Sequence, residues 1–235
     1  MRDFGGRKLG TTPYSLRWPD TLEFTQVLSK MSANAMDKML ETIWRGFSSL
    51  KEDFLDQIDI SKADEELERT ISQTLERHIR KHLSGYESYD VQHGTYEPET
   101  RSPPPAQPPE YDIAFLLKSN ARIMWPLEAK VMRTPANVAP YVKDINNEFL
   151  TGRYAPFSRS AAMLGYLLSG DPEKTTGNIE KSLEAPLIPH PAFHPRFTHH
   201  TSEHQRNLKN KTWASGQFTC HHIIMPLHIE TSHAS

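Results

Sequence analysis

The stretch that most constrains the fold runs from residue 111 to residue 131 and has the sequence YDIAFLLKSNARIMWPLEAKV. Two runs rich in aromatic, β-branched and other apolar residues flank the turn-type residues Lys118, Ser119 and Asn120. Such runs on either side of a short turn are typical of a β-hairpin. The stretch therefore predicts two antiparallel strands that any sheet in this chain has to include.

Side chains alternate between two faces along a strand, so the hairpin has an apolar face and a polar face. The apolar face collects these residues: Ile113, Phe115, Leu117, Ile123, Trp125, Leu127 and Ala129. If Lys118 pairs with Arg122 across the turn, Asp112 lies opposite Glu128, with about 5 Å between their β-carbons. The polar face then carries two carboxylates and the ammonium group of Lys130.

Asp112 followed by Glu128-Ala129-Lys130 resembles the D…(D/E)xK signature of the PD-(D/E)xK nuclease superfamily, which has the restriction-endonuclease-like fold. The resemblance covers roughly residues 63 to 170. The proline of the signature is displaced, because a Pro-Pro pair ends three residues before Asp112 and the direct Pro-Asp dipeptide is absent.

The resemblance implies a divalent metal, usually Mg²⁺ with Mn²⁺ as a substitute, held by Asp112, Glu128 and the carbonyl of Ala129. It also implies that Lys130 positions or activates the attacking water. Hard cations prefer carboxylate and carbonyl oxygens, and they lower the pKa of a bound water. Lys130 would add positive charge where negative charge develops in the reaction. The simpler alternative is a surface hairpin with a cross-strand ion pair.

Composition limits the other possibilities. A length of 235 residues suits one sizeable domain, or one domain with an extra helical segment. The net charge of −2 gives no global basic footprint, so a nuclease would need a local basic groove. The single cysteine, Cys220, excludes a disulfide framework and suits a reducing cytoplasm. No apolar run is long enough to span a membrane, and the N-terminus lacks a signal-peptide core.

The chain before the hairpin is expected to be mostly helical. After an irregular arm over residues 1–20, apolar residues recur at three- and four-residue spacings from residue 21 to about residue 54. We assign residues 1–60 to an N-terminal arm and helical segment, which either packs on the rest of the chain or forms a surface for a partner. Residues 61–235 are expected to form the nuclease-like domain.

A second helix is predicted from about residue 64, capped by Ser61 or Asp64 and stopped at residues 84–85. Its apolar stripe consists of Leu67, Ile71, Leu75, Ile79 and Leu83. Glu68 lies in the middle of this stripe and His82 also falls on it, and an acid on a buried face needs a partner. The family often has a glutamate on this helix, so the resemblance implies that Glu68 is a secondary acidic ligand. Alternatively, Glu68 reaches solvent from the edge of the stripe.

The remaining segments continue a helix–strand order. We predict a first strand over residues 86–97, a stiff proline-rich connector over 101–109 and a helix over 138–152 after the hairpin. A buried strand over 160–169 and a last strand over 218–229 follow. The order of a helix followed by a strand meander agrees with the layout of the family. The expected fold is an α/β domain with a restriction-endonuclease-like mixed sheet flanked by helices.

The tail after residue 170 has a different character. Residues 171–195 are rich in Pro, Glu, Lys and Thr and predict a surface excursion. Most of the twelve histidines lie from His190 onward, and histidine is the commonest metal ligand, so a structural zinc site is one interpretation. No Cys-x-x-Cys or His-Glu-x-x-His motif accompanies them. Contact with phosphate, or an ordinary surface position, is the interpretation that we favour.

Together these features predict a magnesium-dependent endonuclease that hydrolyses DNA, with RNA not excluded, in restriction or anti-phage defence. Positive charge beside its site is expected from Lys143, Arg153 and Arg159, which are otherwise plain solvated charges. One alternative is a catalytically silent relative that binds nucleic acid or a partner protein. Another is a helical adaptor that works through residues 22–54. A homodimer and a role as a partner subunit both stay open.

Overall fold

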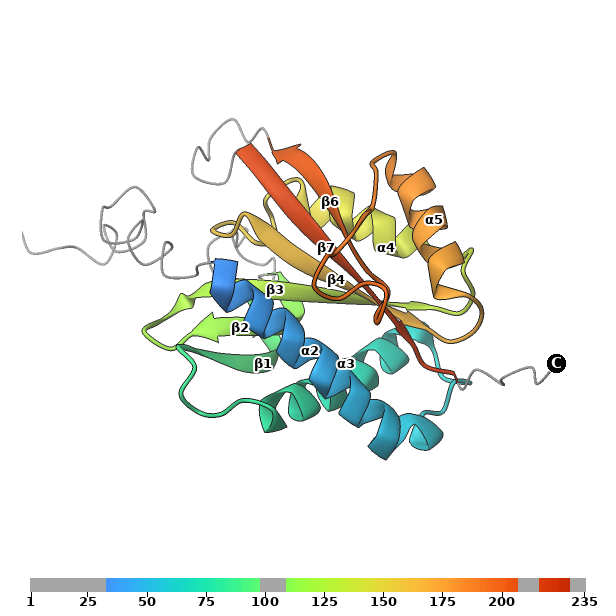
Figure 1. Ribbon diagram of the computed structural model, residues 1–235, viewed down its shortest axis with the longest axis horizontal. Helices are drawn as coiled ribbons and strands as arrows, with labels where there is room; N and C mark the ends of the chain where they lie inside the picture. Colours follow the sequence, from blue (N-terminus) through green and yellow to red (C-terminus); the bar gives the residue numbers. More distant parts are fainter. Residues whose placement is uncertain (1–32, 98–108, 207–215, 229–235) are drawn as a thin grey trace, which may run out of the picture.

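The computed structural model describes residues 33–97, 109–206 and 216–228, which form a seven-stranded sheet with helices on both faces (Figure 1). The three central strands are parallel to one another, and the remaining neighbours pair antiparallel. The predicted α/β class, with a mixed sheet flanked by helices, is therefore confirmed. In sheet order the strands are β1 (Tyr89–Tyr96), β2 (Glu110–Leu117), β3 (Asn120–Met132), β4 (Ser160–Leu167), β7 (Gly216–Pro226), β6 (His199–Arg206) and β5 (Ile188–Pro189).

Two hydrophobic clusters fix the helices on the sheet. One cluster joins α2 and α3 to one face, and the other joins α4 and α5 to the opposite face (Figure 1). The helices are α2 (Ala33–Phe54), α3 (Asp64–Lys81), α4 (Ala139–Asp144) and α5 (Pro172–Leu183), with the short helical turns η2 (Leu55–Gln57) and η3 (Ile145–Phe149). Because both faces are covered, the central strands are apolar on both sides.

The β2–β3 hairpin has the expected register along its paired length. Ile113 pairs with Leu127, and Phe115 pairs with Trp125. The predicted pairing of Lys118 with Arg122 is wrong, because an irregularity next to the turn brings Leu117 opposite Asn120 instead. The predicted apolar face packs against α2 and α3, whereas Ala114, Leu116 and Met124 on the opposite face belong to the second hydrophobic cluster.

Helix α3 confirms the predicted four-residue stripe, since Leu67, Ile71, Leu75 and Ile79 are all buried. The predicted cap is wrong, because Ala63 occupies the N-cap position and makes no side-chain bond. The helix ends at Lys81, and past that end His82 is exposed, whereas Leu83 is partly buried against the core. Helix α2 confirms the later part of the first predicted helix and packs on α3 and the sheet. Residues 1–32 lie outside the described residues.

In the second half of the chain, β4, β7 and the helix over residues 138–152 agree with expectation, the latter as α4 followed by η3. The predicted surface excursion over 171–195 is wrong in part, because residues 172–183 form helix α5. Asp171 caps this helix by accepting a hydrogen bond from the amide of Glu173. Ile179, on the inner face of the helix, is buried. The proline-rich connector lies almost entirely outside the described residues.

Among the described helices, none has the length and apolar composition that crossing a membrane requires.

Candidate functional site

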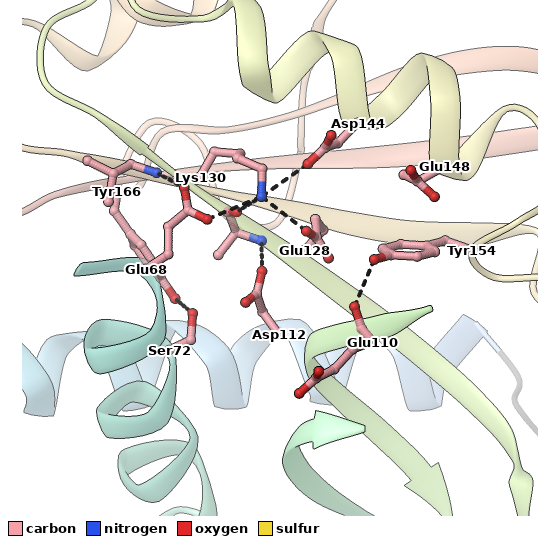
Figure 2. Close-up of polar contacts among 12 residues, drawn as sticks. Glu68, Ser72, Glu110, Asp112, Glu128, Lys130, Asp144, Glu148, Tyr154 and Tyr166 are labelled. Atoms are coloured by element: carbon pink, nitrogen blue, oxygen red, sulfur yellow. Dashed lines mark hydrogen bonds and ion pairs between the residues drawn. The ribbon is translucent and has the colours of Figure 1, made fainter. Parts of the chain in front are cut away.

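The candidate site lies where β2 and β3 diverge. The ladder between the two strands ends before Asp112, while β3 continues to pair with β4. Beyond that point, side-chain carboxylates rather than backbone carbonyls of β2 accept hydrogen bonds from two amides of β3. Asp112 Oδ2 accepts from the amide of Ala129 at 2.8 Å, and Glu68 Oε1, from α3, accepts from the amide of Val131 at 3.2 Å (Figure 2). This fork brings an acidic residue of the helix into contact with the hairpin.

Lys130 lies at the centre of the resulting cluster and is largely buried, with 17% of its side chain exposed. Its ammonium group donates to Glu68 Oε2 at 3.2 Å, to Glu128 Oε1 at 3.1 Å and to the carbonyl of Ala129 at 2.7 Å. Asp144 Oδ2, at the end of α4, lies 3.0 Å from the same nitrogen (Figure 2). All three protons of the ammonium therefore have acceptors.

The cluster contains more negative than positive charge, because four carboxylates surround one ammonium. Burial alone would lower the pKa of Lys130, but the carboxylates of Glu128, Glu68 and their neighbours raise it above its ordinary value. Burial raises the pKa of Asp112 and of Glu68. It raises the pKa of Glu128 well above the usual range, and the nearby charge of Asp112 adds to this effect. Lys130 thus stays protonated, while burial disfavours the ionised forms of Asp112, Glu68 and Glu128.

Glu128 is the least satisfied member of the cluster. Its Oε2 atom is buried and has no hydrogen-bond partner among the described residues. A buried carboxylate oxygen without a partner is costly, and such groups in native proteins usually bind something. Carboxylate and carbonyl oxygens are the ligands that Mg²⁺ and Mn²⁺ prefer, so the donor set fits a hard divalent cation.

Lys130 and such a cation would compete for the same atoms, since the ammonium already contacts Glu128 Oε1 and the carbonyl of Ala129. Among the described residues, two groups of three side chains have ligand atoms that all lie within 4.8 Å of one another. Neither group contains a carboxylate that surrounds Lys130. Those groups contain histidines instead. The acidic cluster is therefore arranged around an internal cation, which separates its oxygens.

The structure brings together every predicted site residue: Glu68, Asp112, Glu128, Ala129 and Lys130. Their roles stay predictions. Sequence reasoning missed Asp144, because its contact depends on which end of α4 lies over β3, and no local pattern encodes that choice. Nearby, Glu148 binds Arg153 at 2.6 and 2.7 Å, so this arginine is already engaged by an acid.

A pocket of about 230 Å³ opens beside the cluster, and Glu68 and Asp112 are among the residues that line it. Its other lining residues are Glu65, Arg69, His93, Gly94, Glu110 and Tyr111. Acids outnumber bases in this lining, so a phosphate would need a bound cation in order to approach. A larger pocket, of about 750 Å³, lies between α2 and residues 192–197 and contains none of the predicted site residues.

The favoured interpretation of the late histidines is wrong for four of them. His199, His200, His221 and His222 are buried, on β6 and β7, rather than exposed to phosphate or solvent. The covering of both faces of the sheet explains their burial, since these strands lie inside it rather than on a surface excursion.

Comparison of the chain with protein-family models, with curated proteins and with solved structures finds no match. The interpretation of the acidic cluster therefore depends on the residues of this chain. Among its features, the central lysine and the unpartnered oxygen of Glu128 bear most directly on function.

Proposed function

We propose that the chain is a magnesium-dependent phosphodiesterase that cuts DNA, with the acidic cluster at the β2–β3 fork as its active site. The observation that carries this proposal is the buried, unpartnered Oε2 of Glu128 in a cluster whose carboxylates outnumber its one ammonium. A divalent cation would relieve both conditions, because it supplies the missing partner and the missing charge.

Asp112, Glu128 and the carbonyl of Ala129 would hold the metal, with Glu68 and Asp144 within reach of the same cluster. Mn²⁺ would serve as a substitute, since it accepts the same oxygen ligands. When bound, the ion polarises a phosphoryl oxygen and lowers the pKa of a bound water.

The protein side chains would divide the remaining tasks. Because its pKa is raised, Lys130 keeps its proton and acts as a fixed positive charge for the developing phosphoryl charge, rather than as a base. Glu68, whose pKa is raised by burial, is suited to accept a proton from the attacking water. The exposed Lys143, next to Asp144 in the chain, is available to contact a phosphate backbone.

The order of elements supports a restriction-endonuclease-like fold as part of the proposal. Helix α3, the antiparallel strands β1–β3, helix α4 and the parallel strand β4 follow one another in the order that the resemblance implies. Restriction or anti-phage defence is the corresponding biological role, and it rests on the resemblance alone.

The test uses the full chain with plasmid DNA, linear DNA and RNA, in Mg²⁺ or Mn²⁺ and in chelator. We expect metal-dependent cutting that falls by about 10²- to 10³-fold in Asp112→Asn and Lys130→Met, because each variant removes a charge that the reaction needs. Glu65→Gln is the matched control, since Glu65 lines the same pocket without touching the cluster's lysine. Its cutting should equal that of the wild type.

Cutting that survives both Asp112→Asn and Lys130→Met would refute the proposed site. Calorimetric titration with Mn²⁺ on the same samples adds an independent readout. Metal binding that Asp112→Asn abolishes, without any cutting of nucleic acid, would favour the silent, nucleic-acid-binding alternative over the enzyme.

A further inference from the structure

A second group of metal-ligating side chains shares no residue with the acidic cluster. Glu173 lies in the first turn of α5, His194 in the turn before β6, and His200 on β6 itself. One ligand atom from each lies within 4.8 Å of the other two. His200 Nε2 is 3.9 Å from Glu173 Oε2. Three separate elements therefore direct nitrogen and oxygen ligands toward one point.

Two of these ligands have buried atoms that lack partners. His200 is only 5% exposed, and its Nδ1 atom has no hydrogen-bond partner within the described part of the chain. The same holds for Nδ1 of His194. No described residue therefore holds either ring through Nδ1, and Nε2 of His200 is the nitrogen that lies 3.9 Å from Glu173.

A neighbouring triad of histidines shows what a satisfied arrangement looks like. The ligand atoms of His190, His199 and His221 also lie within 4.8 Å of one another. The indole of Trp44 lies 3.2 Å from His199 Nδ1, and because an indole NH only donates, that nitrogen must accept. His199 Nε2 then carries the proton and donates to His221 Nδ1 at 3.2 Å. His199 has no lone pair left for a metal, because Trp44 and His221 engage both of its ring nitrogens.

We propose that Glu173, His194 and His200 form a transition-metal site, with Zn²⁺ as the best match. Two imidazole nitrogens and one carboxylate oxygen are characteristic zinc ligands, whereas Mg²⁺ prefers oxygen alone. Thr198 donates to Glu173 Oε1 at 3.3 Å and so orients the carboxylate from outside the ligand set. Three protein ligands leave one position of a tetrahedral ion to solvent, which reaches it past the half-exposed Glu173.

The ion would join the start of α5 to β6. In the chain, these two elements are connected by residues 184–198, which include β5 and His194, so the metal closes a loop between residues 173 and 200. This site is independent of the proposed nuclease activity, because none of its ligands contacts the acidic cluster through any described bond.

The experiment titrates the chelator-stripped full chain with Zn²⁺ in competition with a chromophoric chelator. We expect one ion to bind at this site, with an affinity that falls by at least about 10- to 100-fold in Glu173→Gln and in His194→Ala, the loss seen even when outer partners of a metal site are removed. Co²⁺ absorption bands should appear in the wild type and be lost in both variants. His190→Ala and Asp112→Asn are the matched controls and should bind normally.

Failure of the wild type to bind Zn²⁺ more tightly than the two ligand variants would overturn the proposal. So would loss of binding in His190→Ala, which would place the ion in the neighbouring triad, or in Asp112→Asn, which would place it in the acidic cluster. Glu173→Gln keeps the size of a half-exposed side chain, so its fold should be intact, and circular dichroism of each variant verifies this.

Discussion

Glu128 shows how a single buried side chain can oppose stability. Burial and the charge of Asp112 raise its pKa well above the ordinary value of 4.5, so the folded state holds a proton there more tightly than the unfolded state does. Stability from this group is therefore fully present below pH 4.5 and is lost as the pH rises through the folded-state pKa. At neutral pH the Glu128 carboxylate destabilises the metal-free protein.

We accordingly expect Glu128→Gln to raise the free energy of unfolding of the metal-free protein at pH 7.5 by about 1–3 kcal/mol, the usual cost of an unsatisfied buried group. The gain should disappear as the pH falls toward 4.5. Urea denaturation in chelator across this pH range measures both effects. A variant that is less stable than the wild type at pH 7.5 would contradict this account of the cluster.

At the scale of elements, the contact between α2 and α3 depends on a glycine. A β-carbon at Gly46 would meet the backbone nitrogen of Ile79 at 2.8 Å, which is closer than real β-carbons approach. Backbone cannot move aside as a flexible side chain can, so any side chain at residue 46 must push the two helices apart. Gly177, in α5, has no atom of the described structure within 4 Å of such a β-carbon.

The two glycines give a matched pair of substitutions. Gly177→Ala should raise the free energy of unfolding by about 0.8–1 kcal/mol, because alanine favours a helix by that amount. Gly46→Ala has the same gain in propensity, but overpacking costs about 1–3 kcal/mol or more, so a net loss is expected. Chemical denaturation of both variants measures the difference. Equal stabilisation by both would show that α2 and α3 are not tightly packed.

Local patterns predicted the hairpin, α3, β4 and β7, but not α5, β5 or β6. The stripe of α3 and the register of β2 with β3 follow from side-chain periodicity, which each segment carries within itself. Glu68 was found for the same reason, because its angular position on α3 points to the sheet. Asp144 and the burial of His199 depend on how distant segments pack, and no local period reveals that. Helix α5 was missed because its weakly apolar sequence looked like a surface loop.

At the scale of the whole molecule, buried histidines make folding sensitive to acid. Burial lowers the pKa of His199 to about 2 and the pKa of His221 and His222 to about 3, in each case with help from neighbouring histidines. These groups are neutral in the folded state and take up protons when the chain unfolds. Their contribution is therefore present above pH 6.5 and is lost as the pH falls below it.

We expect these three histidines to lower the free energy of unfolding by about 4 kcal/mol between pH 7.5 and pH 5.5, since each contributes about 1.4 kcal/mol per pH unit below 6.5. Glu128 changes the free energy of unfolding in the opposite direction over this pH range. The measurement should therefore be made on the Glu128→Gln variant. Urea denaturation at several pH values gives the slope, and His222→Gln should reduce it by about one proton. A flat profile would mean that these histidines are not neutral when folded.

The ammonium of Lys130 within the acidic cluster affects whether the protein folds before or after it binds a metal ion. Because the chain supplies a cation of its own, it can complete its fold before it meets any divalent ion, unlike domains that stay unfolded until their metal binds. Maturation and activation are then separate steps. Under the proposed function, newly made molecules could accumulate in an inert form, and a change in available metal would switch them on together.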